Sequence, residues 1–310
     1  MPALNEEAAI GDVLKSIPNK FYDDYLVELL VVNDGSTDAT ERIALFEGAT
    51  VVNHYFNKGL GRAFQTAIEY ALKSRADILV SIDADGQFDS NQIKNLIQPI
   101  IEQSSDFSIG NRFSNGKPKK MPRVKYWGNK RISEVVSIVT KTKIIDASCG
   151  FRAYSRECLL SLNLQGGFTY THETILDLLN KNFKVSQVPV YVKYFDDRIS
   201  RVAGNLFVYG YKTSMIIFKS LKDYKPLQFF LGISFFVLFF ALLLGGFVFY
   251  HWIKTGMITP YKSFGFIALS LCGMSLVIAT LAFIADMLNR IRENQEKILY
   301  ISKKKYFDED

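Results

Sequence analysis

The stretch Ile78-Leu79-Val80-Ser81-Ile82-Asp83-Ala84-Asp85-Gly86-Gln87 joins a short apolar run to a loop with three oxygen-bearing side chains. The apolar run predicts a buried strand, and the loop leaves that strand at its carboxyl end. Open α/β sheets bind ligands at the carboxyl ends of their strands. Hard divalent ions prefer oxygen ligands and also bind phosphate oxygens. The stretch therefore predicts a metal and diphosphate site, with an acidic surface turn as the plain alternative.

Strands and helices alternate along the first half of the chain. Apolar residues within 60–72 recur at steps of three and four, which is typical of an amphipathic helix. The same reading predicts further strands at 26–32, 50–53 and 107–110, and further helices ending at Phe46 and at Ile101. This alternation predicts an α/β fold with a mostly parallel sheet and helices on both faces.

Two long apolar stretches follow, Leu227 to Tyr250 and Ser263 to Ala285, and neither contains Asp, Glu, Lys, Arg or His. Each exceeds the roughly 20 residues that a helix needs to cross a bilayer. A water-soluble domain rarely makes helices that are apolar on all sides, so we favour two transmembrane helices over two buried core helices. Lysines and arginines gather before the first stretch and after the second, which predicts that both termini are cytoplasmic.

The net charge of +6 fits attraction to anionic lipid headgroups, and no interleaved basic and aromatic motif indicates nucleic-acid binding. Cys149, Cys158 and Cys272 show no paired or metal-ligand spacing, which suits a reducing compartment. Gly245-Gly246 and Gly265 would permit close packing of membrane helices, so a homo-oligomer stays open.

Two basic segments have alternative interpretations. The loop 115–122 is either a solvated surface loop or a mobile loop that meets phosphates or the membrane surface. The segment 204–224 mixes large apolar residues with lysines, which is typical of a helix lying in the membrane interface. A connecting helix packed on the soluble domain is the alternative.

Four more patches accompany the Asp-rich loop: Pro2-Ala3-Leu4-Asn5-Glu6-Glu7, Val31-Val32-Asn33-Asp34-Gly35-Ser36-Thr37-Asp38, Gly110-Asn111-Arg112-Phe113 and Cys149-Gly150-Phe151-Arg152-Ala153-Tyr154. Together and in this order they resemble the family 2 glycosyltransferases, most closely the dolichyl-phosphate mannose synthase-like branch, which glycosylates polyprenyl phosphates. The resemblance implies a GT-A type nucleotide-sugar-binding domain over 1–200, an amphipathic juxtamembrane segment over 201–226, transmembrane helices over 227–250 and 263–285, and a cytosolic basic tail over 286–310.

The resemblance also implies roles for individual residues. Nucleotide-sugar contacts fall on Pro2, Ala3, Asn5, Glu6, Asp34, Asp83, Arg198 and Arg201. Metal ligands for Mg²⁺ or Mn²⁺ fall on Asp83, Asp85 and Gln87. Arg112 and Arg131 fall near positions that meet the acceptor phosphate, and guanidinium chemistry adds two more candidates to this cluster, Arg123 and Arg152.

The catalytic candidates are Asp85, Arg112, Glu173 and Asp146, and the roles of the last two depend on the acceptor. A lipid monophosphate is largely dianionic at neutral pH and needs no base, whereas a sugar hydroxyl needs a carboxylate as general base. With a phosphate acceptor the two residues would position cations or the metal. The plain alternatives are a charge at a helix N-terminus for Glu173 and a helix cap for Asp146.

The leading hypothesis is a metal-dependent inverting transferase that moves a sugar from a UDP- or GDP-sugar to dolichyl or undecaprenyl phosphate at the cytoplasmic membrane face. The first rival is a transferase that extends a lipid-linked sugar at a hydroxyl, and the second is a non-catalytic nucleotide-sugar-binding membrane subunit. One departure from the family pattern stands out. Members usually have a hydrophobic strand directly before the segment at Pro2, so a sheet without it would lose central backbone pairing. Either the start lies upstream of Met1 or the chain has been shortened.

Overall fold

The computed structural model describes residues 1–21, 25–164, 170–194 and 225–308, with the single residues Tyr211, Met215, Phe218 and Lys222. The chain divides into two compact units. The first consists of Met1–Ile217 and Leu299–Asp310, and the second of Phe218–Ile298. Arg198 and Arg201, and nearly all of the predicted interfacial segment, lie outside the described residues.

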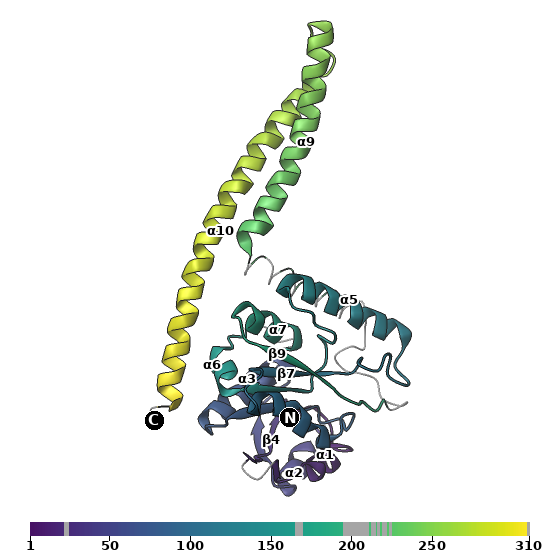
Figure 1. The fold of residues 1–310 in the computed structure, drawn as a ribbon, viewed down its shortest axis with the longest axis vertical. Coiled ribbons are helices and arrows are strands. Elements are labelled where there is room, and N and C mark those ends of the chain that lie inside the picture. The colour runs from purple at the N-terminus through teal and green to yellow at the C-terminus, as the bar shows by residue number, and fades with distance from the viewer. Residues whose placement is uncertain are drawn as a thin grey trace. The chain divides into compact units, whose positions relative to one another are not determined.

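The first unit contains three small sheets (Figure 1). A parallel sheet has the strand order β1 (Pro2–Ala3), β4 (Leu30–Asn33) and β5 (Thr50–Asn53). A mixed sheet has the order β6 (Ile78–Ser81), β8 (Arg152–Ser155), β7 (Phe107–Asn111) and β9 (Val185–Pro189). Strand β8 is antiparallel to both neighbours, and β7 and β9 are parallel. A short antiparallel pair joins β2 (Lys20–Phe21) to β3 (Tyr25–Leu26).

Helices pack against these sheets. Their bounds are α1 (Ile10–Ser16), α2 (Thr40–Phe46), α3 (Leu60–Lys73), the 3₁₀ turn η1 (Ser90–Gln92), α4 (Ile93–Ile101), α5 (Arg123–Thr140), α6 (Arg156–Ser161) and α7 (Thr171–Asn180). The predicted amphipathic pattern places Ala63 and Ala67 of α3 against Val32 of β4. Phe64 stacks on Tyr170 with ring centroids 3.9 Å apart. Helix α3 thus joins the parallel sheet to the start of α7.

The predicted α/β fold is confirmed, with one strand placed differently. The run predicted as a strand over 26–32 is divided, because Tyr25 and Leu26 pair with β2 and only Leu30–Asn33 joins the parallel sheet. The other predicted strands and helices of this half occur within two residues of the expected bounds. Alternating apolar runs therefore located the elements but not the partner of each strand.

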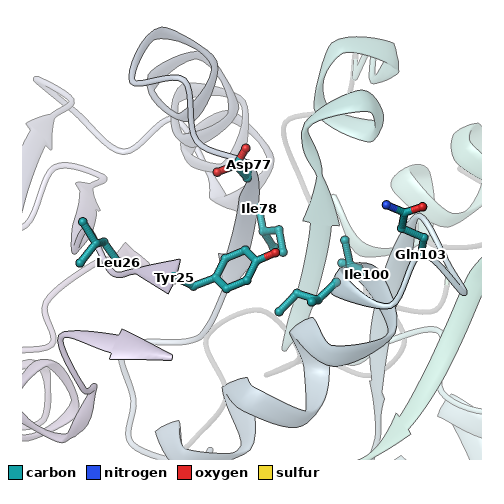
Figure 2. A pocket seen from close by; sticks show the side chains of 7 residues that line it. Tyr25, Leu26, Asp77, Ile78, Ile100 and Gln103 are labelled. Carbon is teal, nitrogen blue, oxygen red and sulfur yellow. The ribbon is translucent and has the colours of Figure 1, made fainter. Parts of the chain in front are cut away.

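Strands β4 and β6 belong to separate sheets. The ammonium group of Met1 donates a hydrogen bond to the Leu30 carbonyl (2.8 Å), as a strand amide would. A cavity of about 470 Å³ lies between the two sheets, lined mainly by apolar residues, among them Leu30, Val80 and Ile97. An adjoining cavity of about 590 Å³ opens at the amino end of β6, and Figure 2 shows Tyr25 and Ile100 approaching it from opposite sides.

The last residues of the chain also belong to the first unit. Asp308 forms an ion pair with Arg156 at the start of α6 (2.5 Å). Lys303 donates to the Leu162 carbonyl at the end of that helix (2.8 Å), and Tyr300 donates to the Glu157 carboxylate. Residues 299–308 therefore contact both ends of α6.

The second unit contains most of two long helices, α9 (Pro226–Thr255) and α10 (Lys262–Asp308), which lie side by side (Figure 1). Both are long and apolar enough to cross a bilayer. Ser234 donates to the Ser275 carbonyl (2.9 Å), and Ser275 donates to the Ser234 carbonyl (3.2 Å). The helices extend beyond the predicted spans, and α10 continues through the segment predicted as a basic tail.

Candidate functional site

Asp83, Asp85 and Gln87 lie in the loop directly after β6, at its carboxyl end. Gly86 has a φ of +70°, a left-handed conformation that glycine adopts without strain. The turn lets the Gln87 amide donate to Asp85 Oδ1 (3.0 Å), and Lys193 donates its amide to the Gln87 carbonyl (2.9 Å). The loop is therefore held by the segment that follows β9.

The carboxylates of this loop repel one another. Burial, and next the charge of Asp85, raise the pKa of Asp83 from 3.8 to about 6. Burial is also the main cause that raises the pKa of Asp85. In the described part of the chain, no Lys or Arg side chain forms a salt bridge with Asp83. A bound divalent cation would relieve this repulsion.

The residues of this loop fit a hard divalent ion as two carboxylates and one amide oxygen. Among the described residues there is no cluster of three or more His, Cys, Asp or Glu side chains that could hold a metal by itself. The loop therefore offers an incomplete ligand set, which suits an ion that is also bound by the phosphate oxygens of a substrate.

Gly150 lies against the Asp83 carboxylate. A Cβ atom at this position would come within 3.3 Å of both Asp83 oxygens, so a larger residue would push the carboxylate aside. The Tyr170 hydroxyl donates to the Gly150 carbonyl (3.0 Å) and lies 2.7 Å from the Ser81 hydroxyl. These contacts fix the segment that faces Asp83. The sequence alone did not indicate that Gly150 lies against the Asp83 carboxylate.

Arg112 directly follows β7 and forms a bidentate ion pair with Asp146. The Arg112 Nε atom lies 2.7 Å from one Asp146 oxygen, and a terminal nitrogen lies 2.8 Å from the other. Asp146 is 1% exposed, and its charge helps to raise the pKa of Arg112 despite burial. The structure thus brings two predicted catalytic residues together, with Asp146 orienting the Arg112 guanidinium.

Lys125, in the first turn of α5, is a residue that the sequence reasoning missed. Burial and next the charge of Arg112 lower its pKa, while Asp85 raises it. Its ammonium lies 5.5 Å from the centre of the Tyr194 ring. No described carboxylate lies within salt-bridge distance of this ammonium. Lys125 and Arg112 therefore form a positively charged pair near the Asp85 carboxylate.

The nucleotide-contact candidates of the first strand form a second cluster. Asn5 accepts a hydrogen bond from the Thr37 amide (2.8 Å), and the Glu6 amide donates to the Thr40 hydroxyl (2.8 Å). These bonds join the segment after β1, with Pro2 and Ala3, to the polar turn after β4. Both segments lie at the carboxyl ends of adjacent parallel strands.

Asp34 is buried within this second cluster. Its carboxylate accepts hydrogen bonds from the amides of Lys58 (2.9 Å) and Gly59 (2.8 Å), and His54 Nδ1 lies 2.7 Å from the same carboxylate. These contacts hold the loop that precedes α3. Both Asp34 oxygens therefore accept hydrogen bonds from within the protein, and the side chain supports the second cluster.

The other three arginines predicted to meet the acceptor phosphate have surroundings unlike those of Arg112. Arg152 is fully buried and donates to the carbonyls of Cys149 (2.7 Å), Ala147 (2.8 Å) and Thr171 (2.6 Å), so its guanidinium is bonded within the core. Arg123 and Arg131 are exposed on α5, and Arg131 forms an ion pair with Glu134 (2.7 Å).

Glu173 lies in the first turn of α7 and is half-buried. The adjacent His172 is fully buried 3.2 Å from the Ser148 hydroxyl, and burial lowers its pKa to about 3. Burial therefore keeps the His172 ring neutral at neutral pH. Residues 165–169, which precede this turn, lie outside the described residues.

The arrangement combines a carboxylate pair, two cations and a polar cluster along the carboxyl ends of the strands. The carboxylates can hold a cation that binds a diphosphate, and the cations can bind a further phosphate. Neither cavity of the interior contains Asp83 or Asp85 in its lining, and the larger one lies at the amino end of β6. The 590 Å³ cavity therefore lies at the opposite end of this strand from the chemistry, and the 470 Å³ cavity runs along the strand as far as Ile82.

The chain is similar in sequence to known proteins. The chain is 32% identical to the UDP-N-acetylglucosamine–dolichyl-phosphate N-acetylglucosaminyltransferase of Methanococcus voltae, over 68% of this chain and 90% of the relative. It is 27% identical to the polyprenol monophosphomannose synthase of Mycolicibacterium smegmatis, over 58% of this chain and 71% of the relative.

A solved structure supports the fold. The crystal structure of glucosyl-3-phosphoglycerate synthase from Mycobacterium tuberculosis, in complex with Mn²⁺, uridine diphosphate and glucosyl-3-phosphoglycerate, superposes with a TM-score of 0.53 at 24% identity, covering 72% of this chain and 77% of that one. The family model described as glycosyl transferase family 2 matches residues 1–162. The chain therefore belongs to glycosyltransferase family 2.

Proposed function

We propose that this glycosyltransferase moves a sugar from a UDP- or GDP-sugar to a polyprenyl phosphate, with inversion at the anomeric carbon and with a bound Mg²⁺ or Mn²⁺. The observation that carries the proposal is that the carboxylates of Asp83 and Asp85 lie within electrostatic range of the cations of Arg112 and Lys125. Relatives named for dolichyl phosphate and polyprenol support the acceptor class.

The carboxylate pair and Gln87 would hold the divalent ion, which supplies Lewis-acid neutralisation of the departing diphosphate. Asp146 holds the Arg112 guanidinium in one orientation before substrate arrives. Arg112 and Lys125 would bind the acceptor phosphate, and their charges favour its dianion. Because a phosphate dianion attacks without losing a proton, this chemistry needs no general base.

The membrane setting follows from the apolar helices. Helices α9 and α10 would span the bilayer, and the basic residues that flank them favour a cytoplasmic catalytic unit with both termini on the same side. A polyprenyl phosphate keeps its chain in the bilayer and its phosphate at the surface. The enzyme would then meet donor from the cytoplasm and acceptor from the membrane.

The proposal is tested with purified, detergent-solubilised protein, a panel of radiolabelled UDP- and GDP-sugars, and polyprenyl phosphate with or without Mg²⁺ or Mn²⁺. We expect metal-dependent label in an acid-labile, alkali-stable lipid, starting with UDP-sugars because of the Methanococcus voltae relative. Asp85→Ala should lower turnover about a hundredfold or more, since the ion loses a ligand. Absence of labelled lipid phosphate with every donor contradicts the acceptor assignment.

Substitutions at Lys125 and Glu173 test whether the acceptor is a lipid phosphate or a sugar hydroxyl. Lys125→Met should raise KM for the polyprenyl phosphate about tenfold while Lys125→Arg retains most activity, since the missing charge contributes a phosphate contact. Glu173→Gln should leave turnover close to normal if no general base is used. Complete loss in Glu173→Gln with donor binding intact favours a sugar hydroxyl as the acceptor, and binding of donor without any transfer favours the non-catalytic subunit.

A further inference from the structure

The surface of α5 reverses the usual distribution of side chains on a helix. Its buried face carries two polar residues, Asn129 and Ser133, before Val136 and Val139. Its exposed face carries large apolar side chains: Val124 (65% exposed), Trp127 (61%), Val135 (41%) and Ile138 (76%). A helix on a water-facing surface normally shows the opposite pattern.

These exposed residues form one continuous stripe. Together with Arg131 they follow at steps of three or four along the helix, so they lie on the same side. The Arg131 guanidinium lies 5.6 Å from the centre of the Trp127 ring. We call Val124, Trp127, Arg131, Val135 and Ile138 the α5 stripe. A helix of 18 residues is about 27 Å long, so the stripe is a long apolar surface.

Cations surround the α5 stripe. Residues 115–145 contain seven lysines, two arginines and one acidic residue, Glu134, which is paired with Arg131. Most of these cations are exposed, in the loop before α5, along the helix and just after it. Apolar side chains flanked by lysine and arginine match the boundary between headgroups and acyl chains of an anionic bilayer.

We propose that α5 lies in the membrane interface, with the α5 stripe inserted among the lipid headgroups and acyl chains. A second copy of the chain is a poorer partner, because stripe-to-stripe packing would oppose two strongly basic surfaces. The inference rests on membrane association of the protein but not on the identity of donor or acceptor. It gives the bilayer a contact with the catalytic unit itself, through the helix that also carries Lys125.

The chain offers a direct reporter, since Trp127 and Trp252 are its two tryptophans. The full-length Trp252→Phe variant is reconstituted in vesicles of phosphatidylcholine and phosphatidylglycerol, with and without lipids brominated near the headgroup. We expect brominated lipid to quench Trp127 about twofold, with little quenching by aqueous iodide. Emission should also be blue-shifted relative to that of the unfolded chain.

A matched control places tryptophan on an exposed apolar position outside the stripe. Phe46 is 85% exposed at the end of α2 and suits this purpose, as Phe46→Trp in a chain lacking Trp127 and Trp252. This reporter should respond to iodide and not to brominated lipid. Adding Ile138→Glu to the Trp127 reporter should weaken bromolipid quenching, because the added charge opposes insertion, while Phe46→Glu should not.

Two results would overturn the inference. Quenching of Trp127 by iodide but not by brominated lipid would show a stripe open to water. Protection from both quenchers would show that a protein surface, such as a second copy, covers the stripe. Neither result depends on sugar transfer, so this test and the test of the proposed function fail separately.

Discussion

The two ends of β6 have opposite surroundings. At the carboxyl end, charged and polar side chains lie close together, and most are fixed by hydrogen bonds, as in the pair of Arg112 and Asp146. At the amino end, mainly apolar side chains line a cavity of about 590 Å³. Tight packing is therefore concentrated at the carboxyl end of β6, where the candidate site lies. The amino end of the same strand tolerates incomplete packing.

The largest expected effect concerns the carboxyl end. Arg152→Met should destabilise the protein by about 3–5 kcal/mol, because several buried carbonyls lose their donor. The midpoint of thermal unfolding in detergent should fall by roughly 10 °C. Arg131→Met is the control and should change the midpoint little, since that side chain is 61% exposed. An equally small shift for Arg152→Met would show that the carboxyl end is not the rigid end.

The next effect concerns the Met1 ammonium, which lines the cavity along β6, and it depends on pH. Burial lowers the pKa of the Met1 ammonium from 8.0 to about 5. The unfolded chain therefore binds the proton more tightly, and stability should rise with pH between these values, by up to about 1.4 kcal/mol per pH unit. The measurement is the unfolding midpoint between pH 6.5 and 8, in a chain with a free Met1 amine.

Two other buried groups, Asp83 and His172, also make the stability depend on pH, but mainly at lower pH. The pKa of Asp83 is raised to about 6, which makes stability fall as pH rises from about 4 to 6, and that of His172 is lowered to about 3, which makes stability rise up to pH 6.5. Both contributions fade within about one pH unit above these values, so the slope near pH 7.5 to 8 reports mainly the Met1 amine. Acetylation of the Met1 amine should flatten the profile, and an unacetylated chain with a flat profile would refute the buried ammonium as its source.

The smallest effect compares two native thiols, one near each end of the sheet. Cys149 precedes β8 at the carboxyl end of β6, and Cys158 lies 3.4 Å from the Asp106 carbonyl, next to the amino end of β7. Burial raises the pKa of both thiols to about 12, so neither reacts at pH 8 until the structure opens locally.

Mass spectrometry after timed alkylation would measure the two rates. Cys158 should react about tenfold faster than Cys149, because the cavities lower the free energy of opening at the amino end. Equal alkylation rates, or faster reaction of Cys149, would show that the amino end does not open more easily than the carboxyl end.

Much of the fold follows from sequence because apolar periodicity is a local property. The run Ile78–Ser81 and the amphipathic pattern of α3 predicted their elements closely, and the Asp-rich loop was found at the expected end of its strand. The division of the predicted strand at 26–32 was missed, because pairing between β2 and β3 depends on partners that periodicity does not name.

The site was harder to predict because similar residues have different surroundings. Arg112 and Arg152 look alike in sequence, yet one faces a buried carboxylate and the other is bonded to three backbone carbonyls from two segments. Lys125 was missed because the inward face of α5 carries polar residues, so the apolar pattern of this helix indicates the wrong face. Only the tertiary structure shows which side of α5 faces the protein interior.

The contacts of residues 299–308 with α6 make the catalytic unit discontinuous in sequence. A gene fragment that stops before α9 would leave the Leu162 carbonyl and the Glu157 carboxylate without their Lys303 and Tyr300 partners. Soluble expression of this enzyme is therefore better attempted by joining the two parts of its unit with a linker than by simple truncation. A purification tag joined directly after residue 310 would lie close in sequence to the ion pair of Arg156 and Asp308.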